Sequence, residues 1–331
     1  MAIILTFAWK YLLFFLIWNS LVVFLFHELE HIGIDLSIPF LPLSTIGIAV
    51  SFYVGFKNGQ SYDRFWEARK IWGGIVNYSR TWSNQVLNFV TDRHATQAVS
   101  KQDLQAVHQQ LIYRHIAWLN ALRISLRRPS SFSLRKLKSI ERMTEKKDYQ
   151  SHLSEEVKPL IDEKEYNYLV QRKNVPTQLI RKQGDALREL MESKGYIEDF
   201  RHMEMMRVLE EFYNLQGKCE RINNTPFPRQ YAYFSKIFTW IFIILLPFGM
   251  VGEFAQMGHE LLWLTVPFCM LISWIFLTME LIGDNSEDPF ENNINDVPMT
   301  ALCRTIEIDL REMLGETDLP PKTEPVYDVL F

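Results

Sequence analysis

Residues 46–73 read IGIAVSFYVGFKNGQSYDRFWEARKIWG, an uncharged apolar run that passes directly into a segment crowded with charges and aromatic rings. The uncharged run reaches back to Ile38, and from there to Phe56 it approaches the roughly 20 residues that a helix needs to cross a membrane. Within it Ile48, Phe52 and Phe56 recur every four positions, so a helix stacks them along one stripe. The stretch therefore predicts a membrane helix with an apolar stripe and a charged end.

The composition places this helix in a membrane protein with a large polar part. The chain of 331 residues has 23 Phe, 13 Tyr and 9 Trp, which is rich in aromatics for a soluble protein. Its mean hydropathy is nevertheless close to zero, so a few apolar spans must be diluted by a long polar region. The net charge of -4 gives no electrostatic footprint for nucleic acid. The three scattered cysteines argue against a disulfide framework or a cysteine zinc site.

Three further segments have the apolarity of a membrane span. The first, residues 11–26, continues an apolar N-terminus that is too long for a secretory signal and lacks the small-residue cleavage site, so we expect it to remain as a helix. The others are residues 237–251 and 261–282, which follow a long polar stretch. Together with residues 38–56 they predict four transmembrane helices.

The distribution of Lys and Arg predicts which side of the membrane each loop faces. The loops at residues 27–37 and 252–260 contain neither residue type. Lys and Arg accumulate on the cytoplasmic side of membrane proteins. Here they gather at the other ends of the spans: Lys10, Lys57, Arg64, Arg69, Lys70, Arg229 and Lys236. We therefore expect a multi-pass protein of the inner (cytoplasmic) cell membrane, with both termini in the cytoplasm.

The long middle of the chain predicts helices outside the membrane. Residues 104–128 and 177–218 place apolar side chains at helical spacing. The polar interval at residues 129–176 is interpreted as solvated helices. The expected fold class is an all-α integral membrane protein with four transmembrane helices and a helical cytosolic region. Its expected parts are residues 1–58 with the first two membrane helices, residues 59–235 as the cytosolic helical region, residues 236–283 with the last two membrane helices, and residues 284–331 as a cytosolic tail.

Residues 26–31 read FHELEH and contain the H-E-x-x-H pattern of zinc metalloproteases. Such a site needs two histidines one helical turn apart, a glutamate base and a third ligand. Here His27, Glu28 and His31 stand at the exit of a span, with a glycine and two prolines soon after, so we expect the helix to end inside the motif. The outer surface offers few third ligands: Glu253, His259 and Glu260. An interfacial helix end is the favoured interpretation, and a membrane zinc protease is a remote alternative.

Three long strings resemble the bestrophin family, specifically its prokaryotic branch. They are GFKNGQSYDRFWEARKIWG at residues 55–73, GKCERINNTPFPRQYAYF at residues 217–234 and EDPFENNINDVPMTALCRTIEIDL at residues 287–310. The resemblance extends over about residues 11–321, in the family's order and with the spans in the expected places. Only the interval at residues 129–176 matches little of the family.

The resemblance implies a homopentameric ion channel, mostly helical, with one pore on the five-fold axis. In the family three apolar residues of the second span line a narrow neck, and alignment puts them at Ile48, Phe52 and Phe56, the stripe that the spacing identifies. Such a neck can gate by dewetting, because ions cannot follow when water leaves it. A channel of this kind is not an enzyme and needs no cofactor. Its partners are the identical subunits, membrane lipid and permeant monovalent ions, with no nucleic acid.

The resemblance also implies a second constriction in the cytosolic part of the pore. Alignment back from Cys219 puts it near Phe200, with Met203 and Glu204 as neighbours. The alternative is that Phe200 is a core aromatic of a cytosolic helix.

Calcium-activated animal members of the family bind the ion with an acidic run after an Asn-Pro-Phe sequence. Here residues 288–296 read DPFENNIND, in which amides and an isoleucine replace most of that run. Calcium takes roughly six to eight oxygen ligands, and Asp288, Glu291 and Asp296 alone make a poor site. We therefore expect no metal site, only a weak remnant of the calcium clasp, and no calcium activation. The tail through Leu310 is expected to wrap against a neighbouring subunit.

An apolar neck carries no charged ring that would select the ion. Family analogy favours anions, principally chloride, and a channel for sodium or potassium is the alternative. A transporter would have inverted repeats or paired broken helices, and a structural scaffold would pass no current. The four spans show neither transporter feature clearly, although Asn19 and Glu280 are polar within them. Glu280 lies near the cytoplasmic end of its span, where we expect it to reach water.

Overall fold

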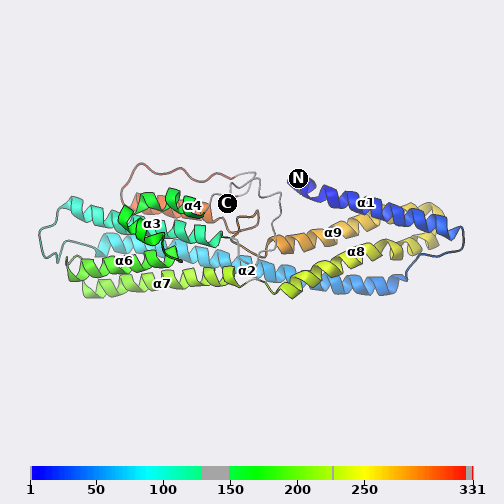
Figure 1. The fold of residues 1–331 in the computed structure, drawn as a ribbon, viewed down its shortest axis with the longest axis horizontal. Coiled ribbons are helices and arrows are strands. Elements are labelled where there is room, and N and C mark those ends of the chain that lie inside the picture. The colour runs from blue at the N-terminus through cyan, green and yellow to red at the C-terminus, as the bar shows by residue number, and fades with distance from the viewer. Residues whose placement is uncertain (1, 129–148, 226, 326–329, 331) are drawn as a thin grey trace. The chain divides into compact units, whose positions relative to one another are not determined.

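The computed structural model describes residues 2–128, 149–225, 227–325 and 330 (Figure 1). Every regular element among these residues is a helix, which confirms the predicted all-α class. The chain divides into two compact units. We call them the membrane unit, Met1–Asp63 with Phe227–Glu287, and the polar unit, Arg64–Pro226 with Asp288–Phe331.

The membrane unit is a bundle of four apolar helices. It contains α1 (Ala2–Glu30), the first part of α2 (Phe40–Phe89), α8 (Arg229–Met257) and α9 (Thr265–Asn285). Each of the four is long and apolar enough to cross a membrane, as predicted, and the helices run lengthwise beside one another (Figure 1). A short 3-10 turn, η2 (His259–Leu264), begins the last span, and α8 continues through Pro247 without ending.

Small residues let the membrane helices approach closely. A Cβ atom added at Gly47 of α2 would lie 2.8 Å from a ring carbon of Phe242 on α8, and one added at Gly249 would meet Leu43. Because lipid is as apolar as these side chains, helix association in a membrane depends on such close packing. On the same face of α2, Val50 and Val54 are buried in the cluster that includes Phe242.

Helix α2 is a single helix of 50 residues that contributes to both units. The charged segment that follows the membrane span therefore continues the same helix as far as Phe89. Gly59, Gly73 and Gly74 lie inside it, and their cost of roughly 1 kcal/mol each relative to alanine does not end the helix.

The polar unit packs its helices around buried aromatic side chains. Its longer helices are the second part of α2, α3 (Lys101–Leu126), α6 (Val175–Glu192) and α7 (Asp199–Asn224). The core includes Trp72, Trp82, Trp118 and Phe212, each nearly or fully buried.

The polar interval that we interpreted as solvated helices also contributes to this core. Residues 129–148 lie outside the described part of the chain. The remainder forms α4 (Tyr149–Glu156), η1 (Lys158–Leu160) and α5 (Glu163–Leu169). Leu153, Val157 and Leu169 are buried, because these short segments turn single apolar side chains inward between their charges.

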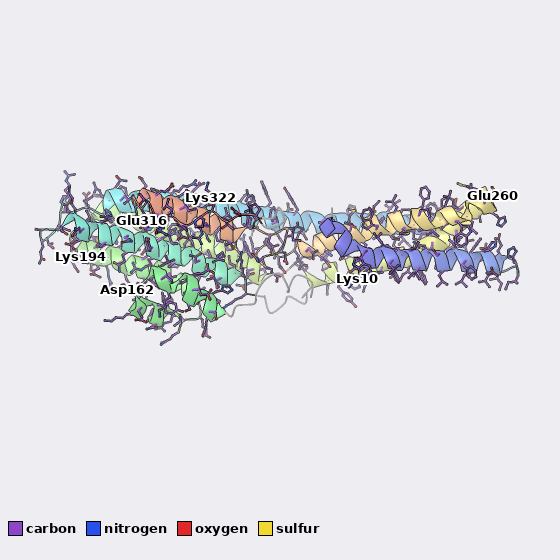
Figure 2. All side chains as sticks on the ribbon, turned by 90° about the horizontal axis from the view of Figure 1, so that it is seen from above. Lys10, Asp162, Lys194, Glu260, Glu316 and Lys322 are labelled. Carbon is purple, nitrogen blue, oxygen red and sulfur yellow. The ribbon has the colours of Figure 1, made fainter. Side chains whose placement is uncertain are left out.

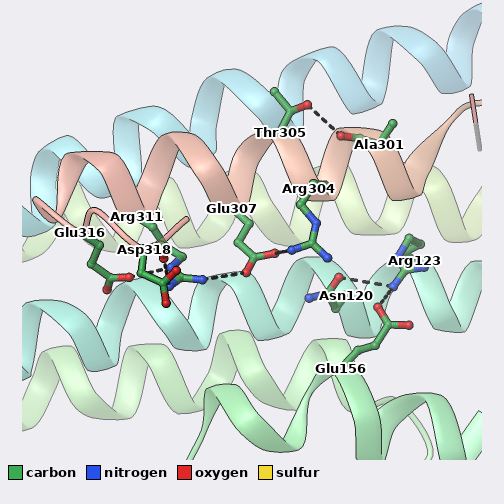
Figure 3. A network of polar contacts seen from close by, with 10 residues as sticks. All are labelled: Asn120, Arg123, Glu156, Ala301, Arg304, Thr305, Glu307, Arg311, Glu316 and Asp318. Carbon is green, nitrogen blue, oxygen red and sulfur yellow. Dashed lines mark hydrogen bonds and ion pairs between the residues drawn. The ribbon is translucent and has the colours of Figure 1, made fainter. Parts of the chain in front are cut away.

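Helix α10 (Met299–Met313) lies along α3 of its own chain. Its buried side chains form one helical stripe: Met299, Cys303, Ile306 and Leu310. Beyond the helix Glu316 accepts hydrogen bonds from Arg311 Nε at 2.6 Å (Figure 3) and from the Tyr113 hydroxyl at 3.0 Å. The apolar stripe of α10 is thus covered within the protomer. The expected contact between the tail through Leu310 and a neighbouring subunit stays a prediction, and it would involve the faces of α10 that do not pack on α3.

Candidate functional site

The apolar stripe of α2 lies on the surface of the protomer. The side chains of Ile48, Phe52 and Phe56 are 71%, 80% and 48% exposed. On the opposite face Val50 and Val54 are only 4% and 1% exposed. Helix α2 therefore has one face that packs inside the protomer and an opposite face whose large apolar side chains are exposed. Such a face suits contact with lipid or the lining of an apolar constriction between copies of the chain.

An aromatic cluster supports the last residue of the stripe. The ring centroid of Tyr231 on α8 lies 6.0 Å from that of Phe56 and 5.9 Å from that of Tyr53, with which it stacks. Tyr53 also meets Phe238 edge-on at 5.9 Å. No local sequence pattern predicts this cluster, because its members on α2 and α8 lie far apart along the chain.

The residue after the stripe carries a buried charge. Lys57 is 1% exposed, and its Nζ atom lies 2.6 Å from Oε1 of Glu280 and also bonds Asp284, both on α9. One sequence-based expectation is therefore wrong: Glu280 does not reach water but is buried against Lys57 inside the bundle. Lys57, counted among the cations at the ends of the spans, has its charge paired there with Glu280 and Asp284.

The charges farther along α2 also pair within the chain. Arg64 donates to the carbonyl oxygens of Ile222 at 3.0 Å and Thr225 at 2.8 Å, at the end of α7. A cation is favoured there because a helix C-terminus carries partial negative charge. Glu67 pairs with Arg221 of the same helix α7.

The predicted second constriction lies at the start of α7. Phe200 is 77% exposed and Met203 is 54% exposed, whereas a core aromatic such as Phe212 of the same helix is buried. Glu204 forms an ion pair with Arg207 one turn farther on, at 2.5 Å. Phe200 is therefore not a core side chain of the protomer, and its place on a pore axis stays a prediction.

The three carboxylates of the calcium-clasp remnant are already engaged or buried. Asp288 lies 3.5 Å from Arg64. Asp296 accepts a hydrogen bond from the backbone N–H of Asn293 at 2.9 Å, and burial raises its pKa to about 7. Glu291 adds to that rise through its charge. Within the described residues no group of three or more His, Cys, Asp or Glu side chains is placed to hold a metal ion.

The H-E-x-x-H motif lies at the outer end of α1. The helix ends at Glu30, inside the motif as predicted, and His31 falls beyond it. The rings of His27 and His31 meet edge-on with centroids 4.7 Å apart. One of the suggested third ligands, His259, instead lies 3.7 Å from Glu30. This geometry fits a polar helix end at the membrane surface.

Comparison with known proteins gives one consistent result. The family model described as bacterial/fungal bestrophin protein matches residues 2–312. The voltage-dependent anion channel-forming protein YneE of Escherichia coli K12 is 27% identical over 306 residues, which are 92% of this chain and 86% of that protein. The voltage-dependent anion channel-forming protein mll4386 of Mesorhizobium japonicum is 26% identical, over 88% of this chain and 79% of that protein.

Solved structures agree with the relatives. A bacterial bestrophin homologue from Klebsiella pneumoniae superimposes with a TM-score of 0.75 and 26% identity, covering 92% of this chain and 98% of that one. A glycine-to-alanine variant of a membrane protein gives a TM-score of 0.76 and 26% identity, covering 95% of this chain and 100% of that one.

Proposed function

The chain belongs to the bacterial and fungal bestrophin family, and on this premise we propose that it forms a homopentameric anion channel in the cytoplasmic membrane. The observation that carries the proposal is the stripe of Ile48, Phe52 and Phe56. Three large apolar side chains project from a membrane helix and stay largely open within the protomer. Around a five-fold axis each of them becomes a ring of five, and the three rings form a neck.

The neck opens and closes to ions through wetting. Apolar rings offer no ligands to replace an ion's hydration shell, so an ion crosses only while water fills the neck. When the rings are narrow, water leaves and conduction stops. Membership in a channel family points to transport and away from enzyme activity. No residue of the stripe can act as an acid, a base or a nucleophile.

The polar unit forms the cytosolic part of the channel, and both termini lie in the cytoplasm. The charge distribution supports this arrangement, because the membrane unit has Lys10 toward one end and Glu260 at the other (Figure 2). In the pentamer the exposed Phe200 and Met203 form a second apolar ring, with Glu204 beside it. The regions expected from the sequence are residues 1–58, 59–235, 236–283 and 284–331, whereas the two compact units divide after Asp63, Pro226 and Glu287.

The anion preference rests on relatives that are named anion channel-forming proteins. The test is the reversal potential of the purified protein in a planar bilayer under a potassium chloride gradient. A value near the chloride equilibrium potential supports the proposal. A value near the potassium potential overturns the anion preference and favours the cation-conducting alternative. The same sample should have about five times the 39.2 kDa mass of the protomer. A conducting monomer would rule out an axial pore.

A further inference from the structure

We propose that Lys57 is a positioning residue of the neck: its buried ammonium, held between Glu280 and Asp284 of α9, fixes the rotation of α2 at Phe56. This inference rests on the proposed function, because only in the proposed pore does the exposed stripe face the five-fold axis. The three side chains, which we call the lysine latch, all belong to the membrane unit.

The latch is buried and connects several helices. Nζ of Lys57 lies 2.6 Å from Oε1 of Glu280 and bonds Oδ1 of Asp284. The second oxygen of Glu280 accepts a hydrogen bond from the Ser235 hydroxyl of α8 at 2.5 Å. The two carboxylates lie four residues apart on α9, so they share one face of the helix and can both contact a single ammonium group. The latch thereby joins α2, α8 and α9.

Breaking the latch by rotating α2 would be costly. A buried charge without its partner is strongly destabilising, whereas an apolar contact tolerates repacking. Successive residues of a helix are about 100° apart around its axis, so the direction of Lys57 fixes that of its neighbour Phe56. Buried ion pairs serve best as devices that select one register among several. This is the role we assign to the latch.

A second contact close to the lysine latch fixes the position of α2 along the axis of α9. The Ser61 hydroxyl donates to the carbonyl oxygen of Gly283 at 3.0 Å. A Cβ atom added at Gly283 would overlap Oδ1 of Asn58 and lie 3.5 Å from Cε of Lys57. Glycine permits this approach without displacing the Asn58 side chain. The two helices thus meet over consecutive turns at the charged end of the neck stripe.

The experiment measures which face of α2 meets water. Phe52→Cys reports on the exposed face and Val54→Cys on the packed face, and each is labelled with positively and negatively charged methanethiosulfonates during current recording. Background reaction is low because the native cysteines of the chain are buried: Cys219, Cys269 and Cys303. Each reporter is placed in the native background and in the neutral triple variant Lys57→Met with Glu280→Gln and Asp284→Asn.

In the native background we expect position 52 to react much faster than position 54. In the triple variant the ratio of the two rates should fall roughly tenfold, which corresponds to about 1.4 kcal/mol of lost orientational preference. Glu280→Gln alone keeps a balanced pair between Lys57 and Asp284, so it should fold normally and lower the ratio in the same direction. The exchange Lys57→Glu with Glu280→Lys should restore the ratio, and the exposed control Lys236→Met should leave it unchanged.

If the ratio of the two rates is unchanged in both the triple variant and Glu280→Gln, the proposal that the lysine latch fixes the rotation of α2 is wrong. The neck proposal fails separately, if labelling of Phe52→Cys in the native background leaves the current unaltered. In that case the rate ratio still decides whether Lys57 orients the helix, with the reaction followed by mass spectrometry.

Discussion

At the scale of single residues, substitution of Phe52 gives the most direct test of the channel proposal. It is the most exposed member of the stripe and lies at its centre. In the proposed neck, Phe52→Ala removes bulk that excludes water, and lowering the wetting barrier by about 1 kcal/mol should raise the current roughly fivefold. Single-channel recording measures the open fraction and the conductance. The matched control is Phe24→Ala, an exposed aromatic on α1. Equal currents in the native protein and Phe52→Ala would show that no gate lies there.

His115 makes a prediction about stability in the polar unit. Its ring is buried beside Trp118 and Phe212, with one nitrogen 2.8 Å from the Ser79 hydroxyl, and burial lowers its pKa from 6.5 to about 3. Between these two pH values the unfolded chain binds a proton that the folded chain excludes. The stability that the neutral His115 gives the folded chain is therefore complete above pH 6.5. As the pH falls below this value, the free energy of unfolding decreases by about 1.4 kcal/mol per pH unit.

Thermal unfolding followed by tryptophan fluorescence at about pH 7.5, 6.5 and 5.5 checks this effect, since the range spans the ordinary pKa of histidine. The native protein should lose stability over this range more steeply than His115→Gln, whose side chain does not titrate. Identical slopes for the two proteins would mean that His115 is protonated or solvated in the folded chain.

At the scale of elements, the sequence predicted what depends on local pattern and missed what depends on distant partners. The four spans and the stripe of α2 could be predicted because apolar length and four-residue spacing are local properties. The partners of Lys57 could not be predicted, because Glu280 lies 223 residues farther along the chain. For the same reason Lys57 resembled an ordinary cation at the membrane edge. The packing of α10 on α3 of the same chain could not be predicted either, because the two helices are distant in sequence.

The loop at residues 288–296 makes the prediction for calcium. A calcium ion would have to displace Arg64 from Asp288 and remove the proton that burial favours on Asp296. Sensor sites bind calcium at up to about 10 µM, and we expect no heat of binding in calorimetry at that concentration and no change in current. Magnesium provides the control for nonspecific ion effects. Micromolar binding of calcium alone would show that the loop rearranges into a site.

At the scale of the whole molecule, the charge distribution predicts which side of the membrane each loop faces. No Lys or Arg occurs between Lys10 and Lys57, or between Lys236 and Arg304. Both outer loops lie within these intervals, so we expect the Lys and Arg side chains that reach water to lie on the cytoplasmic side. Family membership supports the channel architecture, but the proposed orientation rests on this asymmetry alone.

Trypsin tests the orientation, because it cleaves only after Lys and Arg. Added to right-side-out spheroplasts, it should leave the chain intact, since the outer loops contain no cleavage site. Added to inverted vesicles, it should reach exposed lysines such as Lys10 and Lys236 and shorten the chain. Ile32→Lys places a cleavage site on an exposed residue of the first outer loop and should make the chain sensitive from outside. Cleavage of the native chain in spheroplasts would reverse the assigned orientation. The polar unit would then face outward, and the proposed second ring at Phe200 would lie outside the cell.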